Sequence, residues 1–303
     1  MKAITYILCL LASIASAQQV ADTYYRPDIL NIAYDKNAGP VVFIDEGHHN
    51  FHTKSGRYQA FSDLLERDGY RVKAYAGPFM TQRLESGQIL VISNALNQIN
   101  INKWYLPTPS AFSKKEIETV KQWVANGGSL FLIADHMPMA GAAEDLAKVF
   151  GFEMTNGFAL NSNQNGPTLF RVEDQTLIEN EITAGRYVNE SVSEVASFTG
   201  QAFRSPEDAK PILILPESHI NILPDTAWVF EGDIKQYNAK GMHQGAYMEY
   251  GEGRIVVFGE AAMFTSQLAG PNRQRFGMSH ELAKQNYQLL LNIIHWLDRG
   301  ISN

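Results

Sequence analysis

The feature that most constrains this fold is the regular alternation of short apolar runs with amphipathic stretches through residues 41–150. A continuous apolar run predicts a strand buried on both faces, and apolar residues at helical spacing predict a helix that packs on the sheet. Because each crossover returns the chain to the same edge, this order predicts a doubly wound, mostly parallel α/β sheet with helices on both faces. The predicted strands are 41–45, 70–76, 89–93 and 129–134, and the predicted helices include 58–65, 113–124 and 143–150.

Residues 151–210 break this rhythm, since Asn, Gln, Gly, Ser and Thr are frequent there and short β-like pieces alternate with turns. We interpret them as an inserted irregular and β lobe over the sheet. The sheet is predicted to resume afterwards and to end in a hairpin and a terminal helix. The chain is therefore divided into an N-terminal arm, 18–40, and a single α/β domain, 41–298, whose late strands are 211–215, 227–230, 246–250 and 254–258.

Residues 1–17 have the pattern of a secretory signal, with Lys2 at the positive end, an apolar stretch and the small-residue cleavage site Ala15-Ser16-Ala17. We expect an exported protein, periplasmic or secreted, without membrane insertion, because no later segment is long enough to span a bilayer. The only cysteine, Cys9, lies inside this signal. The mature chain therefore has no thiol for a disulfide, a metal ligand or a nucleophile.

Composition and charge indicate which kinds of molecule this protein is expected to bind. A hydrophobic content of 45% is sufficient for a full core, and the formal net charge is −7. No basic run resembles a surface that tracks phosphates, so nucleic acid is not an expected partner. We expect a small-molecule or glycan substrate, and the sequence indicates no particular oligomeric state.

Ionisable residues follow three of the predicted strands. In open parallel sheets, ligands bind outside the carboxyl ends of the strands, so these segments are expected to converge although they are distant in sequence. Titratable groups gathered at such an edge are candidate acids, bases and metal ligands. The predicted catalytic residues are Glu46 and His49 after the first strand, Asp135 and His136 after the fourth, and Glu260 after a late strand.

One mechanism uses a metal. Glu46, His49, His52 and His136 are predicted to hold one divalent ion, zinc by preference, which would lower the pKa of a bound water and supply a hydroxide. Their spacing matches no standard zinc pattern. An alternative is a structural metal that only staples the loop 48–52.

A second mechanism needs no metal. The carboxyl groups of Glu46, Asp135 and Glu260 would act as acid and base around a glycosidic or ester bond, with His49 or His136 as proton carrier. The sequence does not separate these two mechanisms.

Each of these residues also has a purely structural interpretation. Asp135 is equally well placed to cap the helix that follows its strand. Asp45 is expected to be structural, because strand alternation points it opposite to Glu46, and His48 is expected to be exposed.

Polar and aromatic residues near the same edge are suited to holding a polar ligand. Aromatic faces stack on sugar rings, and side-chain amides bind hydroxyl groups. For Trp104 the alternative is a buried side chain that pins a loop. The predicted ligand-binding residues are Asn50, Asn94, Trp104, Tyr105 and Gln267, and residues 164–166 and 199–201 are predicted to form a lid.

Three strings, residues 44–53, 132–138 and 257–264, resemble the exported bacterial proteins grouped as DUF4350-like, whose architecture is similar to class I glutamine amidotransferase-like and ThuA-like domains. The resemblance implies a flavodoxin-like sheet. It does not imply glutamine hydrolysis, because those enzymes use a cysteine nucleophile and the corresponding turn here is Ala134-Asp135-His136. The association of ThuA-like proteins with sugar metabolism points to a carbohydrate substrate.

Taken together, these features predict an exported hydrolase that acts on a carbohydrate or a related polar substrate at the edge of the sheet. The rival hypothesis is a non-catalytic domain of the same fold that binds a glycan or a protein, in which the aromatic loop at Trp104 and Tyr105 matters more than the histidines.

Overall fold

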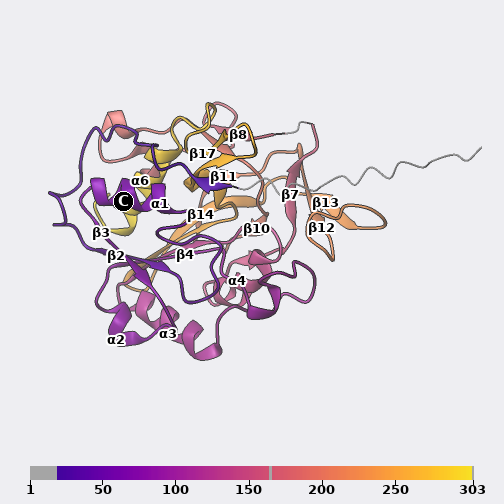
Figure 1. Ribbon diagram of the computed structural model, residues 1–303, viewed down its shortest axis with the longest axis horizontal. Helices are drawn as coiled ribbons and strands as arrows, with labels where there is room; N and C mark the ends of the chain where they lie inside the picture. The colour runs from indigo at the N-terminus through magenta and orange to yellow at the C-terminus, as the bar shows by residue number, and fades with distance from the viewer. Residues whose placement is uncertain (1–18, 164–165, 302–303) are drawn as a thin grey trace, which may run out of the picture.

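The computed structural model describes residues 19–163 and 166–301, so the predicted signal and the first two residues of the predicted lid, 164 and 165, lie outside the described residues. A nine-stranded sheet forms the centre of the molecule, and five neighbouring strands in it run parallel in the order β3-β2-β4-β5-β15 (Figure 1). This is the flavodoxin-like order, so the predicted doubly wound, mostly parallel sheet is confirmed. The five strands are β2 (Val41–Asp45), β3 (Arg71–Tyr75), β4 (Ile89–Ser93), β5 (Ser129–Ile133) and β15 (Gly253–Phe258).

Helices cover both faces of the sheet (Figure 1). Leu132 and Ile133 of β5 point to opposite faces and join different cores, one built with α3 and α4 and the other with α1 and α6. Ser113 and Glu116 form a capping box at the start of α3, in which each side chain accepts a backbone N–H of the other residue. The helices are α1 (Gln59–Arg67), α2 (Thr81–Leu84), α3 (Lys114–Ala125), α4 (Met139–Lys148), α5 (Glu181–Ala184) and α6 (Asn286–Leu297), with short 3₁₀ helices η1 (Gln98–Asn100), η2 (Val188–Glu190) and η3 (Ala262–Phe264).

Beyond β15 the sheet becomes antiparallel. The predicted hairpin is present, with β14 (His243–Tyr250) paired to β15. One predicted strand is wrong: residues 227–230 form no strand, and Ala227 and Trp228 lie in a turn in which Trp228 has a φ of +66°, which a strand cannot accommodate. The remaining strands of this sheet are β6 (Glu153–Met154), β10 (Phe203–Arg204) and β11 (Lys210–Ile214).

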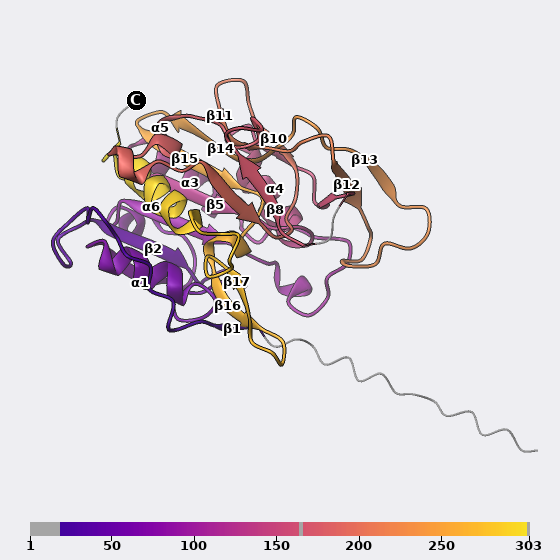
Figure 2. The ribbon, with the colours of Figure 1, turned by 90° about the horizontal axis from the view of Figure 1, so that it is seen from above.

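Three smaller sheets surround this centre. Residues 151–210 supply strands to two of them and also add β6 and β10 to the main sheet. In Figure 2 the third lies at one end of the molecule, where the arm strand β1 runs beside the hairpin β16–β17. No helix in the described part of the chain is long and apolar enough to cross a membrane. The small sheets contain β7 (Phe158–Asn161), β12 (His219–Leu223) and β13 (Lys235–Asn238); β8 (Thr168–Arg171) and β9 (Glu194–Ser197); and β1 (Val20–Ala21), β16 (Ser266–Ala269) and β17 (Gln274–Gly277).

Candidate functional site

Asp135 and Glu260 leave neighbouring parallel strands at the same level. The last registered pair of β5 and β15 is Ile133 with Phe258, and each carboxyl residue follows two positions later. The ladder continues past the strand ends, because the N–H of Ala134 donates to the carbonyl of Phe258 at 3.0 Å. The register of the sheet therefore brings the two acids together.

Glu260 is a fully buried carboxyl group. Its two oxygens accept the N–H groups of Ala262 and Met263, each at 2.8 Å, which holds it over the start of η3. Burial raises the pKa of Glu260 well above its usual range, and the nearby carboxylate of Asp135 raises it further. Glu260 is thus a positioned neighbour of Asp135, with a raised pKa and no surface from which to touch a substrate.

Asp135 retains some contact with solvent, with 8% of its surface exposed. Its Oδ1 accepts the N–H of His136 at 2.8 Å, and its own N–H donates to Oδ1 of Asn94 at 2.9 Å. The alternative role as a cap for α4 is wrong, because the helix begins after Pro138 and no side chain caps it. The carboxylate is therefore held at the strand end with Oδ2 left open.

The imidazole of His136 is fixed in one tautomer. Its Nδ1 lies 2.7 Å from the carbonyl oxygen of Met137, which can only accept, so Nδ1 carries a proton, and in the neutral imidazole the lone pair is on Nε2. The ring stacks on Phe158 with centroids 4.2 Å apart and meets the edge of Trp228 at 4.7 Å. The contacts with Phe158 and Trp228 therefore fix the orientation of the His136 ring.

Three polar atoms at this edge are open. Oδ2 of Asp135, Nε2 of His136 and Nδ2 of Asn94 have no hydrogen-bond partner among the described residues, yet none of the three is sealed from solvent. Asn94 has a φ of +48°, a left-handed backbone that asparagine tolerates, and it directly follows β4. An acceptor, a base and a donor thus come from adjacent strand ends.

Buried side chains of Tyr58, His52 and Ser93 pack together next to this edge of the sheet. Tyr58 stacks on His52 with centroids 4.6 Å apart and donates from its hydroxyl to the carbonyl of Ala261 at 3.3 Å. Nδ1 of His52 lies 3.1 Å from Oγ of Ser93. Burial lowers the pKa of His52 to about 3, with Arg57 adding to the effect, so this ring is neutral. His52 packs beneath the site and supports Tyr58.

Two paired loops form an aromatic wall beside His136. The N–H of Ala227 donates to the carbonyl of Trp104 at 2.8 Å, which ties the loop after η1 to the turn that carries Trp228. Trp104 is half-buried against Phe51, and Trp228 is 53% exposed. The expected role of Trp104 as part of a ligand surface and its role as a loop pin are both compatible with this packing, and Tyr105 beside it is exposed.

The loop after β2 is organised around His48, which is buried, so the expectation that it is exposed is wrong. Its Nδ1 bonds Asp45 and its Nε2 bonds Glu116, each at 2.9 Å. Burial lowers the pKa of His48, but its hydrogen bonds to these carboxylates and their charges outweigh burial, and the pKa is raised. Burial raises the pKa of Glu116, but its bonds to Ser113 and His48 bring it down to about 2. Asp45 is structural, as the strand alternation predicts.

Among the described residues, no hydrogen bond links the other candidates from this loop to Asp135. Oε1 of Glu46 accepts the N–H of Lys54 at 2.7 Å, and Asn50 donates to Oδ2 of Asp45 at 2.9 Å. His49 is exposed at a φ of +49°, and none of the described residues hydrogen-bonds its ring. These side chains fold the loop or face solvent.

The structure does not bring the four suggested metal ligands together. Among residues 19–163 and 166–301, no three His, Cys, Asp or Glu side chains gather in a way that could hold a metal ion. The reason is local: Glu46 and His52 are engaged within their own loop, His49 points to solvent and His136 turns into the aromatic wall.

Gln267 is also buried in its own hairpin. Its Nε2 donates to Oγ1 of Thr265 at 2.9 Å, and its Oε1 has no partner within the described part of the chain. In the predicted lid, Gln201 is buried and donates to the carbonyl of Ala134 at 2.9 Å. Gly200 beside it packs against Glu260, so residues 199–201 form a fixed cover over that carboxyl group.

Sequence reasoning missed three aromatic residues of this site: Tyr58, Phe158 and Trp228. Tyr58 has the spacing of an ordinary core residue, and Phe158 lies in the region interpreted as an irregular lobe. For Trp228 a usable signal existed, because Pro224-Asp225 precedes it and Asp after Pro favours a turn over a strand.

Comparison with known proteins supports the fold. No family model matches the chain, and no curated protein matches it. Among solved structures, the mmIFT52 N-terminal domain is 12% identical, with a TM-score of 0.59 over 85% of this chain and 97% of that domain. A ThuA-like protein from Bacteroides uniformis ATCC 8492 is 12% identical, with a TM-score of 0.50 over 87% of this chain and 94% of that one. At these identities the likeness is one of fold, and it agrees with a ThuA-like, flavodoxin-type domain.

Proposed function

We propose that this protein is an exported hydrolase that acts on a carbohydrate or a related polar substrate, with His136 and Asp135 as its acid–base pair. The observation that carries the proposal is the set of three open polar atoms on Asn94, Asp135 and His136, fixed at the carboxyl edge of the sheet. Export rests on the signal pattern of residues 1–17, and the finer relationship to DUF4350-like proteins rests on the three strings that resemble them.

The tautomer of His136 supports a role as general base. Its Nε2 would take a proton from a water molecule, whose oxygen attacks the substrate carbon and displaces the leaving group. The same nitrogen, now protonated, would return the proton to that leaving group. The negative charge of Asp135 would stabilise the imidazolium that forms between these two steps.

The side-chain amide of Asn94 supports a role in binding. Its Nδ2 is a preorganised donor for a substrate oxygen that gains negative charge during the attack. Glu260 acts as a positioning residue, since its buried carboxyl group is held by two backbone N–H groups next to Asp135. The mechanism uses only side chains that the fold gathers. Of the four suggested metal ligands, His136 takes part in it, and Glu46, His49 and His52 do not.

The aromatic wall supports the choice of substrate class. Trp228 presents an exposed ring beside His136, and Trp104 lies on the same side. Flat aromatic faces suit the apolar faces of sugar rings. The wall would hold a ring while the open polar atoms act on a neighbouring bond.

The test is a panel of chromogenic glycosides and esters offered to the mature protein. We expect turnover of at least one class, and a loss of roughly a hundredfold or more in kcat for Asp135→Asn. Asp145→Asn is the matched control, because Asp145 is an exposed aspartate on α4. Equal activity of the wild type and Asp135→Asn would refute the assignment.

A non-catalytic binding domain is the second candidate, and the exposed wall favours it specifically. Trp228, Phe230 and Tyr105 all present exposed rings on the paired loops. This hypothesis predicts glycan binding without turnover, with Trp228→Ala abolishing the binding and Asp135→Asn leaving it intact.

A further inference from the structure

A hollow lies between the N-terminal arm and the β16–β17 hairpin. These two segments run side by side (Figure 2). β1 pairs with β16, with Val20 opposite Leu268, and this pairing fixes the arm against the hairpin. The hollow has a volume of about 470 Å³. It is lined by Asp22, Tyr24, Tyr25, Arg26 and Pro27 of the arm and by Leu268, Arg273 and Arg275 of the hairpin.

Its lining is strongly basic. Arg26, Arg273 and Arg275 are all exposed, and none of them forms a salt bridge or a side-chain hydrogen bond with a described residue. The only acid in the lining is Asp22, which is buried and whose Oδ1 accepts the N–H of Tyr24 at 3.1 Å. Three guanidinium groups without a partner among the described residues thus line one hollow, in a chain whose formal net charge is −7.

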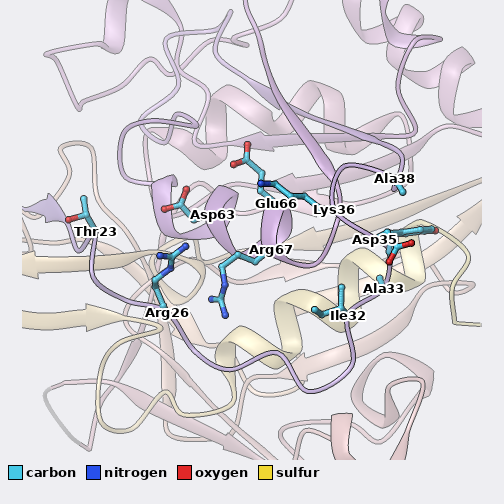
Figure 3. Close-up of a pocket in the computed structure, with 11 residues that line it drawn as sticks. Thr23, Arg26, Ile32, Ala33, Asp35, Lys36, Ala38, Asp63, Glu66 and Arg67 are labelled. Carbon is cyan, nitrogen blue, oxygen red and sulfur yellow. The ribbon is translucent and has the colours of Figure 1, made fainter.

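The larger cavity next to it provides a contrast. That cavity, of about 1050 Å³, lies between the arm and α1 and shares Arg26 (Figure 3). There the cations Arg26, Lys36 and Arg67 are balanced by Asp35, Asp63 and Glu66, and Figure 3 shows acids and bases interspersed around the space. A balanced lining does not favour an anion. Of these two cavities, only the smaller one has an excess of positive charge in its lining.

We propose that the hollow between the arm and the hairpin binds a phosphate or sulfate monoester. A planar guanidinium group presents parallel N–H donors that match the oxygens of such an anion, and these charge-assisted bonds are among the strong hydrogen bonds in proteins. Tyr24 and Tyr25 line the same hollow and would contact the group that carries the ester. This site is separate from the proposed hydrolase site.

Isothermal titration calorimetry at low ionic strength tests the proposal, with inorganic phosphate, inorganic sulfate and phenyl phosphate as probes. We expect saturable binding of phenyl phosphate that weakens at least tenfold in the double variant Arg273→Gln/Arg275→Gln, because two guanidinium groups that would form charge-assisted bonds with the anion are lost. Arg26→Gln should weaken it as well. The ranking of phosphate against sulfate identifies which ester the site prefers.

Arg204→Gln is the matched control, because Arg204 is an exposed arginine on β10 outside the lining of this hollow. We expect this variant and Asp135→Asn to bind the probes as the wild type does. An absence of saturable binding, or an equal loss of binding in Arg204→Gln, would overturn the proposal. Because the readout is binding and not turnover, this result is independent of the proposed hydrolase activity.

Discussion

Burial decides which of two identical functional groups can act. Asp135 and Glu260 both carry a carboxyl group at a strand end, yet only Asp135 has an oxygen open to solvent. Glu260 has both oxygens committed to backbone N–H groups and a raised pKa. The sequence shows both residues as equivalent acids, because neither burial nor the separation of two side chains can be read from their spacing.

The raised pKa of Glu260 predicts a specific dependence of stability on pH. Above about pH 4.5 the unfolded chain loses this proton while the folded protein keeps it, so the free energy of unfolding falls as pH rises toward the folded pKa. Asp135→Asn removes the like charge and lowers that pKa. The decrease in the free energy of unfolding between low and high pH should then be smaller in this variant. The difference should be about 1.4 kcal/mol for each unit by which the pKa of Glu260 is lowered.

Urea unfolding at about pH 5 and about pH 8 measures this effect in the wild type and in Asp135→Asn. Asp145→Asn serves as the control for a change of surface charge. If the two pH values give the same difference in Asp135→Asn as in the wild type, Asp135 and Glu260 do not interact as described.

At the scale of elements, the strand ends were predictable and the loops were not. The apolar runs define β4, β5 and β15, and a parallel register then carries Asn94, Asp135 and Glu260 to one edge. The aromatic wall depends instead on a bridge between two loops, Tyr105 with Thr226, that are far apart in the sequence. No local pattern encodes such a pairing between loops, although Pro224-Asp225 does signal the turn that carries Trp228.

Residues 199–201, which cover Glu260, pack closely against it through Gly200. Gly200 has a φ of +98°, and a Cβ there would lie 2.4 Å from the carbonyl oxygen of Gly259 and 2.9 Å from Cβ of Glu260. Gly200→Ala should therefore destabilise the protein by clearly more than the roughly 1 kcal/mol that a positive φ alone costs.

Gly232→Ala is the matched control for that variant. Gly232 has a similar φ of +91°, but a Cβ there would meet nothing within 4 Å. Thermal unfolding of the two variants separates the cost of a positive φ, which both share, from the steric clash of the new Cβ, which only Gly200→Ala has. Equal losses of stability would mean that residues 199–201 do not press on Glu260.

At the scale of the whole molecule, the alternation of strands and helices was sufficient to predict the doubly wound sheet. It was insufficient for the sheet's antiparallel edge, where β6 and β10 come from the region interpreted as a separate lobe. These strands are two residues long, too short to produce a periodic signal. The consequence for function is that Phe158, which follows β6, could not be placed beside His136.

The sequence predicts a catalytic role for both His49 and His136, and the fold places them in different environments. His136 is held at the strand edge with a fixed tautomer, whereas His49 is exposed and unpartnered among the described residues. The most direct test is therefore kcat/KM of His136→Gln beside His49→Gln, on a substrate that the wild type turns over. We predict a loss of roughly a hundredfold or more for His136→Gln and a change within about twofold for His49→Gln. Full activity of His136→Gln, or an equal loss in both variants, would contradict the account.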